Sequence, residues 1–244
     1  MTDIVDPQEL EGLRVAFLIA DGVSLVELEE PRRILEAAGA HVELVAPRYG
    51  EVHTMDHLDK AGTVPVDRAL LDADPQRYDA LVLPGGVANA DHLRRDPDAV
   101  AFVAGFPTLG RPVAAICHAP WLLVEAGVAR GRTLTSCASL KTDIRNAGGA
   151  WVDEPVHVDD GLITSRELQR TRAASRSRPA AGGVCHAVRA ARRGALARRA
   201  SPPSASVRVP DGLVRKLTRH PAGAMIRGDP GEPVRRTVVG RGES

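Results

Sequence analysis

The segment from Val113 to Gly127 carries the residue types of a reactive cysteine site. A run of small and apolar residues, VAAI, leads into Cys117, and HAPWLLVEAG follows with the apolar spacing of a helix. This pattern places Cys117 on a tight turn between a strand and a helix. Unpaired backbone N–H groups and the helix dipole favour a thiolate over a thiol at such a position. The thiolate is the nucleophilic form, so the pattern favours cysteine chemistry.

The same residues also permit a purely structural interpretation. A cysteine in an apolar run is often a small buried side chain of the core. His118 is adjacent to Cys117, and adjacent residues on a turn rarely face each other, so His118 is equally compatible with a partly exposed histidine. Residue types alone leave both interpretations open.

A second element is Leu83-Pro84-Gly85-Gly86, at the end of the apolar run YDALVL. Two glycines at a strand end allow backbone N–H groups to point into a cleft. Together with the N–H of His118, Gly85 and Gly86 can form an oxyanion hole. Glycines end many strands, so this motif is weak when taken alone.

Other candidate residues favour structural roles. Cys137, in LTSCASL, is expected to be structural. His53 and His57 have metal-like spacing with Asp56 between them, but no second ligand pair follows at a zinc-finger distance. We therefore expect neither a metal site nor a bound cofactor.

The surrounding chain alternates strand-like and helix-like segments, which predicts an α/β fold with helices on both faces of a mostly parallel sheet, a flavodoxin-like three-layer sandwich. The segment 49–66 reads as a loop or a small β-excursion. The predicted strands are 14–20, 41–47, 78–86, part of 111–127 and a short one near Thr133; the predicted helices are 25–38, 96–109, the second part of 111–127 and 139–147; a hairpin is predicted over 151–164.

The composition divides the chain near Arg166. Residues 1–166 hold 15 Lys and Arg, 26 Asp and Glu and all seven aromatic residues, whereas the remainder has a net charge of +12. We predict an N-terminal extension over 1–13, a folded domain over 14–166 and a disordered Arg-, Ala- and Pro-rich tail over 167–244. The tail lacks aromatic residues for base stacking, so we expect no nucleic-acid partner.

The cysteines and the apolar runs bear on the compartment. Cys117, Cys137 and Cys185 form no CxxC pair, and no signal peptide or run of about 18 apolar residues is present. We expect a cytoplasmic protein in a reducing compartment, with no membrane partner.

The sequence resembles the PfpI family of intracellular proteases and deglycases, within the class I glutamine amidotransferase-like superfamily. The resemblance rests on DALVLPGG, on PVAAICHAPWLLVEAGVARGRTLTS and on DIRNAGGAWVDEPVHVDDGLITSR. It implies that Cys117 is the nucleophile, that His118 is its partner base and that Asp91 of a neighbouring subunit completes a triad. A homo-oligomer is therefore expected. Asp91 is equally compatible with capping a short helix.

One position departs from the family pattern. The family places a Glu after the first strand, where its carboxyl meets the nucleophilic sulfur. Aligning ADGVSLVELEEP puts Ser24 at this position, so Ser24 is the predicted sulfur-contacting residue. Glu27, one helical turn later, is an alternative that we do not favour. A hydroxyl cannot supply a carboxyl's proton, so the alignment puts catalysis in question.

The resemblance implies a cysteine-dependent hydrolase that acts on peptides or on adducts between glyoxals and protein side chains. The alternatives are a non-catalytic stress protein, acting as a redox sensor or a chaperone holdase, and an inactive truncated product. The resemblance stops at Arg166, before the final helix of the family. A frameshift in the coding sequence would explain this ending.

Overall fold

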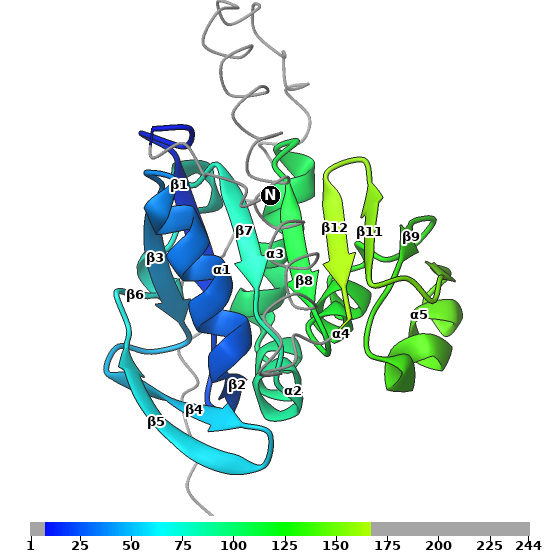
Figure 1. The fold of residues 1–244 in the computed structure, drawn as a ribbon. Helices are drawn as coiled ribbons and strands as arrows, with labels where there is room; N and C mark the ends of the chain where they lie inside the picture. The colour runs from blue at the N-terminus through cyan, green and yellow to red at the C-terminus, as the bar shows by residue number, and fades with distance from the viewer. Residues whose placement is uncertain (1–7, 167–244) are drawn as a thin grey trace, which may run out of the picture. The chain divides into compact units, whose positions relative to one another are not determined.

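A seven-stranded sheet forms the centre of the fold in the computed structural model, which describes residues 8–166 (Figure 1). The strand order is β11-β12-β8-β7-β1-β3-β6, and every neighbouring pair is parallel except β11 and β12. The strands are β1 Arg14–Leu18, β3 His41–Ala46, β6 Arg68–Ala69, β7 Ala80–Leu83, β8 Val113–Ile116, β11 Val156–Asp159 and β12 Leu162–Ser165. This arrangement confirms the predicted α/β class.

Helices cover both faces of this sheet, as the alternation along β1 requires. Val15 and Phe17 pack in one core with Leu28 of α1, whereas Ala16 and Leu18 belong to a second core that includes α3 and α4. The helices are α1 Leu25–Ala37, α2 Val87–Arg94, α3 Pro97–Thr108, α4 Pro120–Glu125 and α5 Lys141–Asn146. Figure 1 shows α1 in front of the sheet and α3 behind it.

Two smaller sheets flank the central one. The predicted β-excursion is an antiparallel hairpin of β4 Glu51–Asp56 and β5 Asp59–Pro65, with β2 Val23–Ser24 alongside β4. Trp151 was expected in the last hairpin, but it belongs to β10 Ala150–Trp151, which pairs with β9 Thr133–Leu134. The turn before α5 is a 3₁₀ segment, Ala138–Leu140.

The described part of the predicted N-terminal extension packs onto the domain. Leu10 is fully buried and Leu13 nearly so, and the Leu10 N–H donates to the Ala38 carbonyl oxygen at 2.8 Å. The predicted tail over 167–244, with Cys185, lies outside the described residues. Within 8–166, no helix is long and apolar enough to cross a bilayer.

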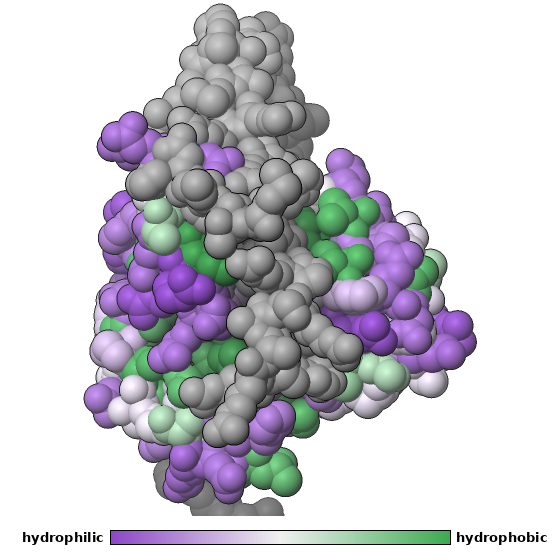
Figure 2. Space-filling view, in the orientation of Figure 1, coloured by the Kyte–Doolittle hydropathy of each residue, from purple (hydrophilic) through white to green (hydrophobic). Residues whose placement is uncertain are grey.

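The visible surface of the described residues is mostly hydrophilic, with smaller apolar patches between (Figure 2). Exposed apolar side chains include Leu58, Leu71 and Val158. Single exposed apolar residues are normal on folded proteins, so these residues require no special role.

Candidate functional site

Cys117 lies on the predicted turn between a strand and a helix. It directly follows β8, and α4 begins at Pro120 after the turn. Its φ is +58°, a left-handed conformation that is uncommon and costly for a residue with a side chain. The residue is 8% exposed. A strained backbone at the junction of a strand and a helix is the geometry of a nucleophile elbow.

His118 faces the cysteine despite being its neighbour in the chain. Its Nδ1 lies 3.2 Å from the Cys117 Sγ, and its Nε2 lies 3.2 Å from the Ser139 Oγ. The imidazole ring also meets the Trp121 ring edge-on, with the centroids 5.7 Å apart. The contact that a partner base needs is therefore present.

The two glycines after β7 are required by close packing at the elbow. A Cβ on Gly85 would lie less than 3.0 Å from the Cys117 Cβ and from the Glu27 carboxylate. Gly86 has a φ of +100° and immediately precedes α2. These residues thus bring backbone close to the cysteine. An oxyanion hole made by Gly85, Gly86 and His118 stays a prediction.

The structure brings the side chain of Glu27 to the elbow, which corrects our choice of Ser24 over Glu27. The Glu27 side chain is 3% exposed, and its carboxylate lies beside Gly85 at the point that the Cys117 Cβ also approaches. Ser24 meets this region through its backbone, since its N–H donates to the Gly85 carbonyl oxygen at 3.2 Å. Among the described residues, the Cys117 sulfur is hydrogen-bonded to His118 and not to the Ser24 hydroxyl. The site therefore has the carboxyl that we expected it to lack.

Asn89 on α2 fixes the glycine turn and was not singled out from the sequence. It is 1% exposed. Its Oδ1 accepts a hydrogen bond from the Ala20 N–H at 2.7 Å, and its Nδ2 donates to the carbonyl oxygens of Pro84 and Gly85 at 2.9 and 3.1 Å. The sequence did contain a signal for this role: Asn89 follows Pro84-Gly85-Gly86 by three residues, and a buried polar side chain on a helix needs hydrogen-bond partners.

Asp91 is paired with an arginine of its own helix. It lies within α2 and forms an ion pair with Arg94 at 2.7 Å, a contact that lowers the pKa of the Asp91 carboxyl. The Arg94 guanidinium in turn lies 4.7 Å from the centroid of the Trp121 ring. Arg94 and Trp121 thus link Asp91 to the His118 ring. A role for Asp91 of a neighbouring subunit stays a prediction.

Cys137 lies beside Cys117 and His118, although we expected only a structural role for it. The two sulfur atoms and the His118 ring nitrogen all lie within 4.8 Å of one another, and this is the one cluster of three such ligand atoms among residues 8–166. The Cys137 N–H also donates to the Cys117 carbonyl oxygen at 2.9 Å. His53, by contrast, bonds Asp21 through Nδ1 at 3.1 Å and forms no such cluster with Asp56 and His57.

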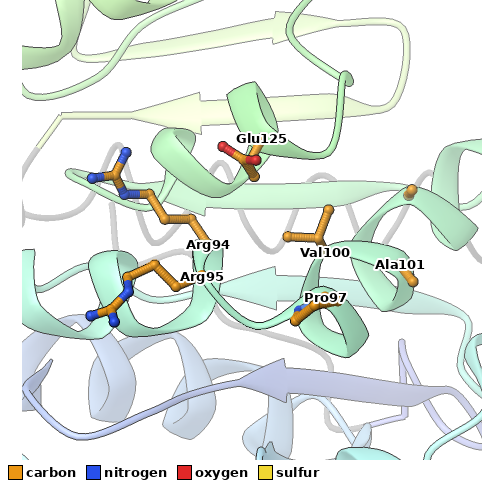
Figure 3. A pocket seen from close by; sticks show the side chains of 7 residues that line it. Arg94, Arg95, Pro97, Val100, Ala101 and Glu125 are labelled. Carbon is orange, nitrogen blue, oxygen red and sulfur yellow. The ribbon is translucent and has the colours of Figure 1, made fainter. Parts of the chain in front are cut away.

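Two further cavities lie away from these residues. One of about 740 Å³ is bounded by Arg94 and Arg95, by α3 and by Glu125 of α4, as Figure 3 shows. The other, of about 690 Å³, lies beyond the ends of β1 and β3 and is lined in part by Asp21 and His92. Neither is lined by a residue of the elbow.

The chain is similar to known proteins in sequence and in fold. A deglycase of Pyrococcus abyssi is 43% identical over 154 residues, which cover 63% of this chain and 90% of that protein. Protein/nucleic acid deglycase 2 of Escherichia coli is 38% identical over 154 residues, covering 63% and 88%. The crystal structure of Drosophila melanogaster DJ-1beta is similar with a TM-score of 0.62 and 25% identity, over 75% of this chain and 97% of that one.

The match to a protein family covers most of the chain, including every residue of the elbow. Residues 13–176 match the family described as DJ-1/PfpI. The chain therefore belongs to the DJ-1/PfpI family.

Proposed function

We propose that this protein is a cysteine-dependent deglycase, an enzyme that hydrolyses adducts between glyoxals and amino or thiol groups. Relatives with 38% to 43% identity are named deglycases, and they match nearly their whole length to this chain. The resemblance to PfpI proteins also implies intracellular proteases, so peptide hydrolysis is the competing activity. An adduct carbonyl is the more electrophilic of the two substrates.

The residues of the elbow have separate roles in this chemistry. The Cys117 thiolate attacks the electrophilic carbonyl carbon of the adduct, and the carbonyl oxygen becomes an oxyanion. Backbone N–H groups of Gly85, Gly86 and His118 stabilise this oxyanion. The His118 Nδ1, 3.2 Å from the sulfur, is within reach to accept and return the thiol proton.

Glu27 supplies the second acid–base group. Its carboxylate approaches the cysteine from the α1 side, across Gly85. Burial shields this carboxyl from bulk water, and a carboxyl beside a reacting group can act as a general acid or base. Cys117 thus has an imidazole at its sulfur and a carboxyl on the Gly85 side of its Cβ, and either group can transfer a proton while the adduct is bound.

A single observation carries the proposal: the strained left-handed Cys117 places its sulfur 3.2 Å from the His118 Nδ1. A core cysteine needs neither the strain nor the contact. Strain of this kind persists only where the surrounding structure enforces it, and it is concentrated at functional sites.

The test uses an amine or a thiol that has been allowed to react with methylglyoxal, with release of the unmodified group as the readout. We expect Cys117→Ser to abolish turnover and Glu27→Gln to lower it by about 100-fold or more. Ser24→Ala is the matched control and should retain turnover, since Ser24 contributes through its backbone. Equal turnover by Cys117→Ser contradicts the proposal. Faster cleavage of an unmodified peptide than of the adduct favours the protease.

A further inference from the structure

The site contains a second sulfur for which the proposed hydrolysis has no use. Cys137 lies on the loop between β9 and the 3₁₀ segment Ala138–Leu140, and it is half-buried. Its Sγ lies within 4.8 Å of both the Cys117 Sγ and the His118 ring nitrogen. We propose that Cys117 and Cys137 form a reversible disulfide when a hydroperoxide oxidises the site, so that Cys137 acts as the resolving cysteine.

The backbone already holds the two cysteines at a suitable separation. The Cys137 N–H donates to the Cys117 carbonyl oxygen at 2.9 Å. This bond holds the backbones of the two residues against each other, and their sulfur atoms lie within 4.8 Å. A disulfide needs an S–S distance of about 2.05 Å, so the two side chains must turn towards each other by less than 3 Å for the bond to form.

Ser139 connects the two sulfur atoms through His118. The Ser139 Oγ donates to the Cys137 Sγ at 3.5 Å and lies 3.2 Å from the His118 Nε2, while the His118 Nδ1 faces the Cys117 Sγ. If Ser139 donates to sulfur, His118 donates from Nε2 and accepts at Nδ1 from the Cys117 thiol. One chain of hydrogen bonds thus receives the Cys117 proton and stabilises negative charge on Cys137.

The chemistry needs one hydroperoxide and no other oxidant. The Cys117 thiolate attacks the peroxide oxygen, the O–O bond breaks, and the leaving group departs as water or an alcohol after protonation. The resulting sulfenic acid is attacked at sulfur by the Cys137 thiolate, and its hydroxyl departs as water. Overall, two thiols and one hydroperoxide give one disulfide, one alcohol or water, and one water. An external dithiol restores both thiols by exchange.

The disulfide changes what the site can do. The bonded Cys117 cannot attack a carbonyl, so deglycase turnover stops until a thiol reductant acts. The same bond protects the sulfur from sulfinic acid, which thiols do not reduce. The inference rests on the proposed function only in taking Cys117 as the reactive thiol.

The test compares the full-length wild type, Cys137→Ser and Cys185→Ser after treatment with two molar equivalents of hydrogen peroxide, the amount that adds two oxygen atoms to one thiol. Remaining thiols are blocked, and the peptides are analysed by mass spectrometry. Wild type and Cys185→Ser should both give a linked Cys117–Cys137 peptide, whereas Cys137→Ser should give a Cys117 peptide that has gained two oxygen atoms. A wild-type protein with oxygenated Cys117 and reduced Cys137, or with Cys117 joined to Cys185, overturns the inference.

Two further measurements separate this inference from the proposed function. Dithiothreitol should restore the deglycase turnover of peroxide-treated wild type but not of peroxide-treated Cys137→Ser. Ser139→Ala should form the disulfide about fivefold more slowly, because one hydrogen bond to the attacking sulfur is lost. A disulfide that forms while turnover is undiminished would refute cysteine catalysis and leave the disulfide established. Unchanged turnover without a disulfide would refute the disulfide and leave cysteine catalysis to the Cys117→Ser comparison.

Discussion

Replacing Gly85 by alanine tests whether the close approach of Gly85, Glu27 and Cys117 is what makes the site work. The added Cβ would lie 2.8 Å from the Cys117 Cβ and 3.0 Å from the Ile116 carbonyl oxygen, and it would overlap the Glu27 carboxylate. Two of these neighbours are fixed to the backbone of the elbow. The Glu27 carboxyl, at the end of a longer side chain, must therefore move.

The two expected effects differ in size. Overpacking of this kind costs about 1 to 3 kcal/mol of unfolding free energy. A displacement of about 1 Å in a reacting group costs about 100-fold in rate. Gly85→Ala should therefore fold, with reduced stability, and should lose about 100-fold or more of its deglycase turnover.

Urea unfolding followed by the fluorescence of Trp121 and Trp151 gives the stability, and release of amine from a methylglyoxal adduct gives the turnover. Gly110→Ala is the matched control, because Gly110 has a φ of +64° and open space around its Cβ position. That variant should lose about 1 to 2 kcal/mol to backbone strain and keep its turnover. A Gly85→Ala protein as active as Gly110→Ala would refute the role given to the Glu27 carboxyl.

Three other variants test the elements around the site. Arg68 donates to Glu43 and holds the pKa of that buried carboxyl at about 2 instead of 4.5. The ionised Glu43 therefore stabilises the fold above about pH 4.5, and this stabilisation is lost as the pH falls towards 2. Glu43→Gln should lower the unfolding free energy by about 3 kcal/mol at pH 7, and urea titrations should show this difference from wild type shrinking between pH 4.5 and 2. Asn89→Ala removes the side-chain partner of the Ala20 N–H and of the Pro84 carbonyl oxygen, and leaves the Gly85 carbonyl oxygen with the Ser24 N–H; it should lower both the unfolding free energy, by about 1 to 3 kcal/mol, and the turnover. Asp96→Ala removes the hydrogen bonds that cap α3, and should lower the thermal midpoint through a loss of about 1 kcal/mol while turnover stays at the wild-type level.

The sheet and its helices could be predicted because local sequence determines them. Strands of a parallel sheet are buried on both faces, so β1, β7 and β8 appear as continuous apolar runs. Asp96 followed by proline predicts the start of α3, and the structure confirms that the Asp96 side chain caps that helix. The Trp151 strand was misplaced because its partner, β9, is distant in sequence and only two residues long.

Our choice of Ser24 over Glu27 was wrong because it rested on the alignment alone and did not consider which face of α1 is buried. The buried residues of α1 are Glu27, Leu28, Pro31 and Leu35, which lie on one side of a helix. An acidic side chain on that apolar face is expected to be buried, and a buried carboxyl is costly unless it has polar partners or a catalytic role. Glu29, which falls outside the face, is exposed. The spacing of the apolar residues in α1 therefore predicts that Glu27 is buried, which the alignment did not indicate.

The conformation of Cys117 itself could not be predicted from the residues around it. Its N–H donates to the Ser165 carbonyl oxygen and its own carbonyl oxygen accepts from the Cys137 N–H, both at 2.9 Å. The elbow is therefore held by β12 on one side and by the loop after β9 on the other, two segments far along the chain. Because the φ of +58° is unfavourable in isolation, these bonds are needed to hold the sulfur in its place beside His118. The reactivity of Cys117 consequently depends on assembly of the β8–β12 edge of the sheet as well as on the ICH motif.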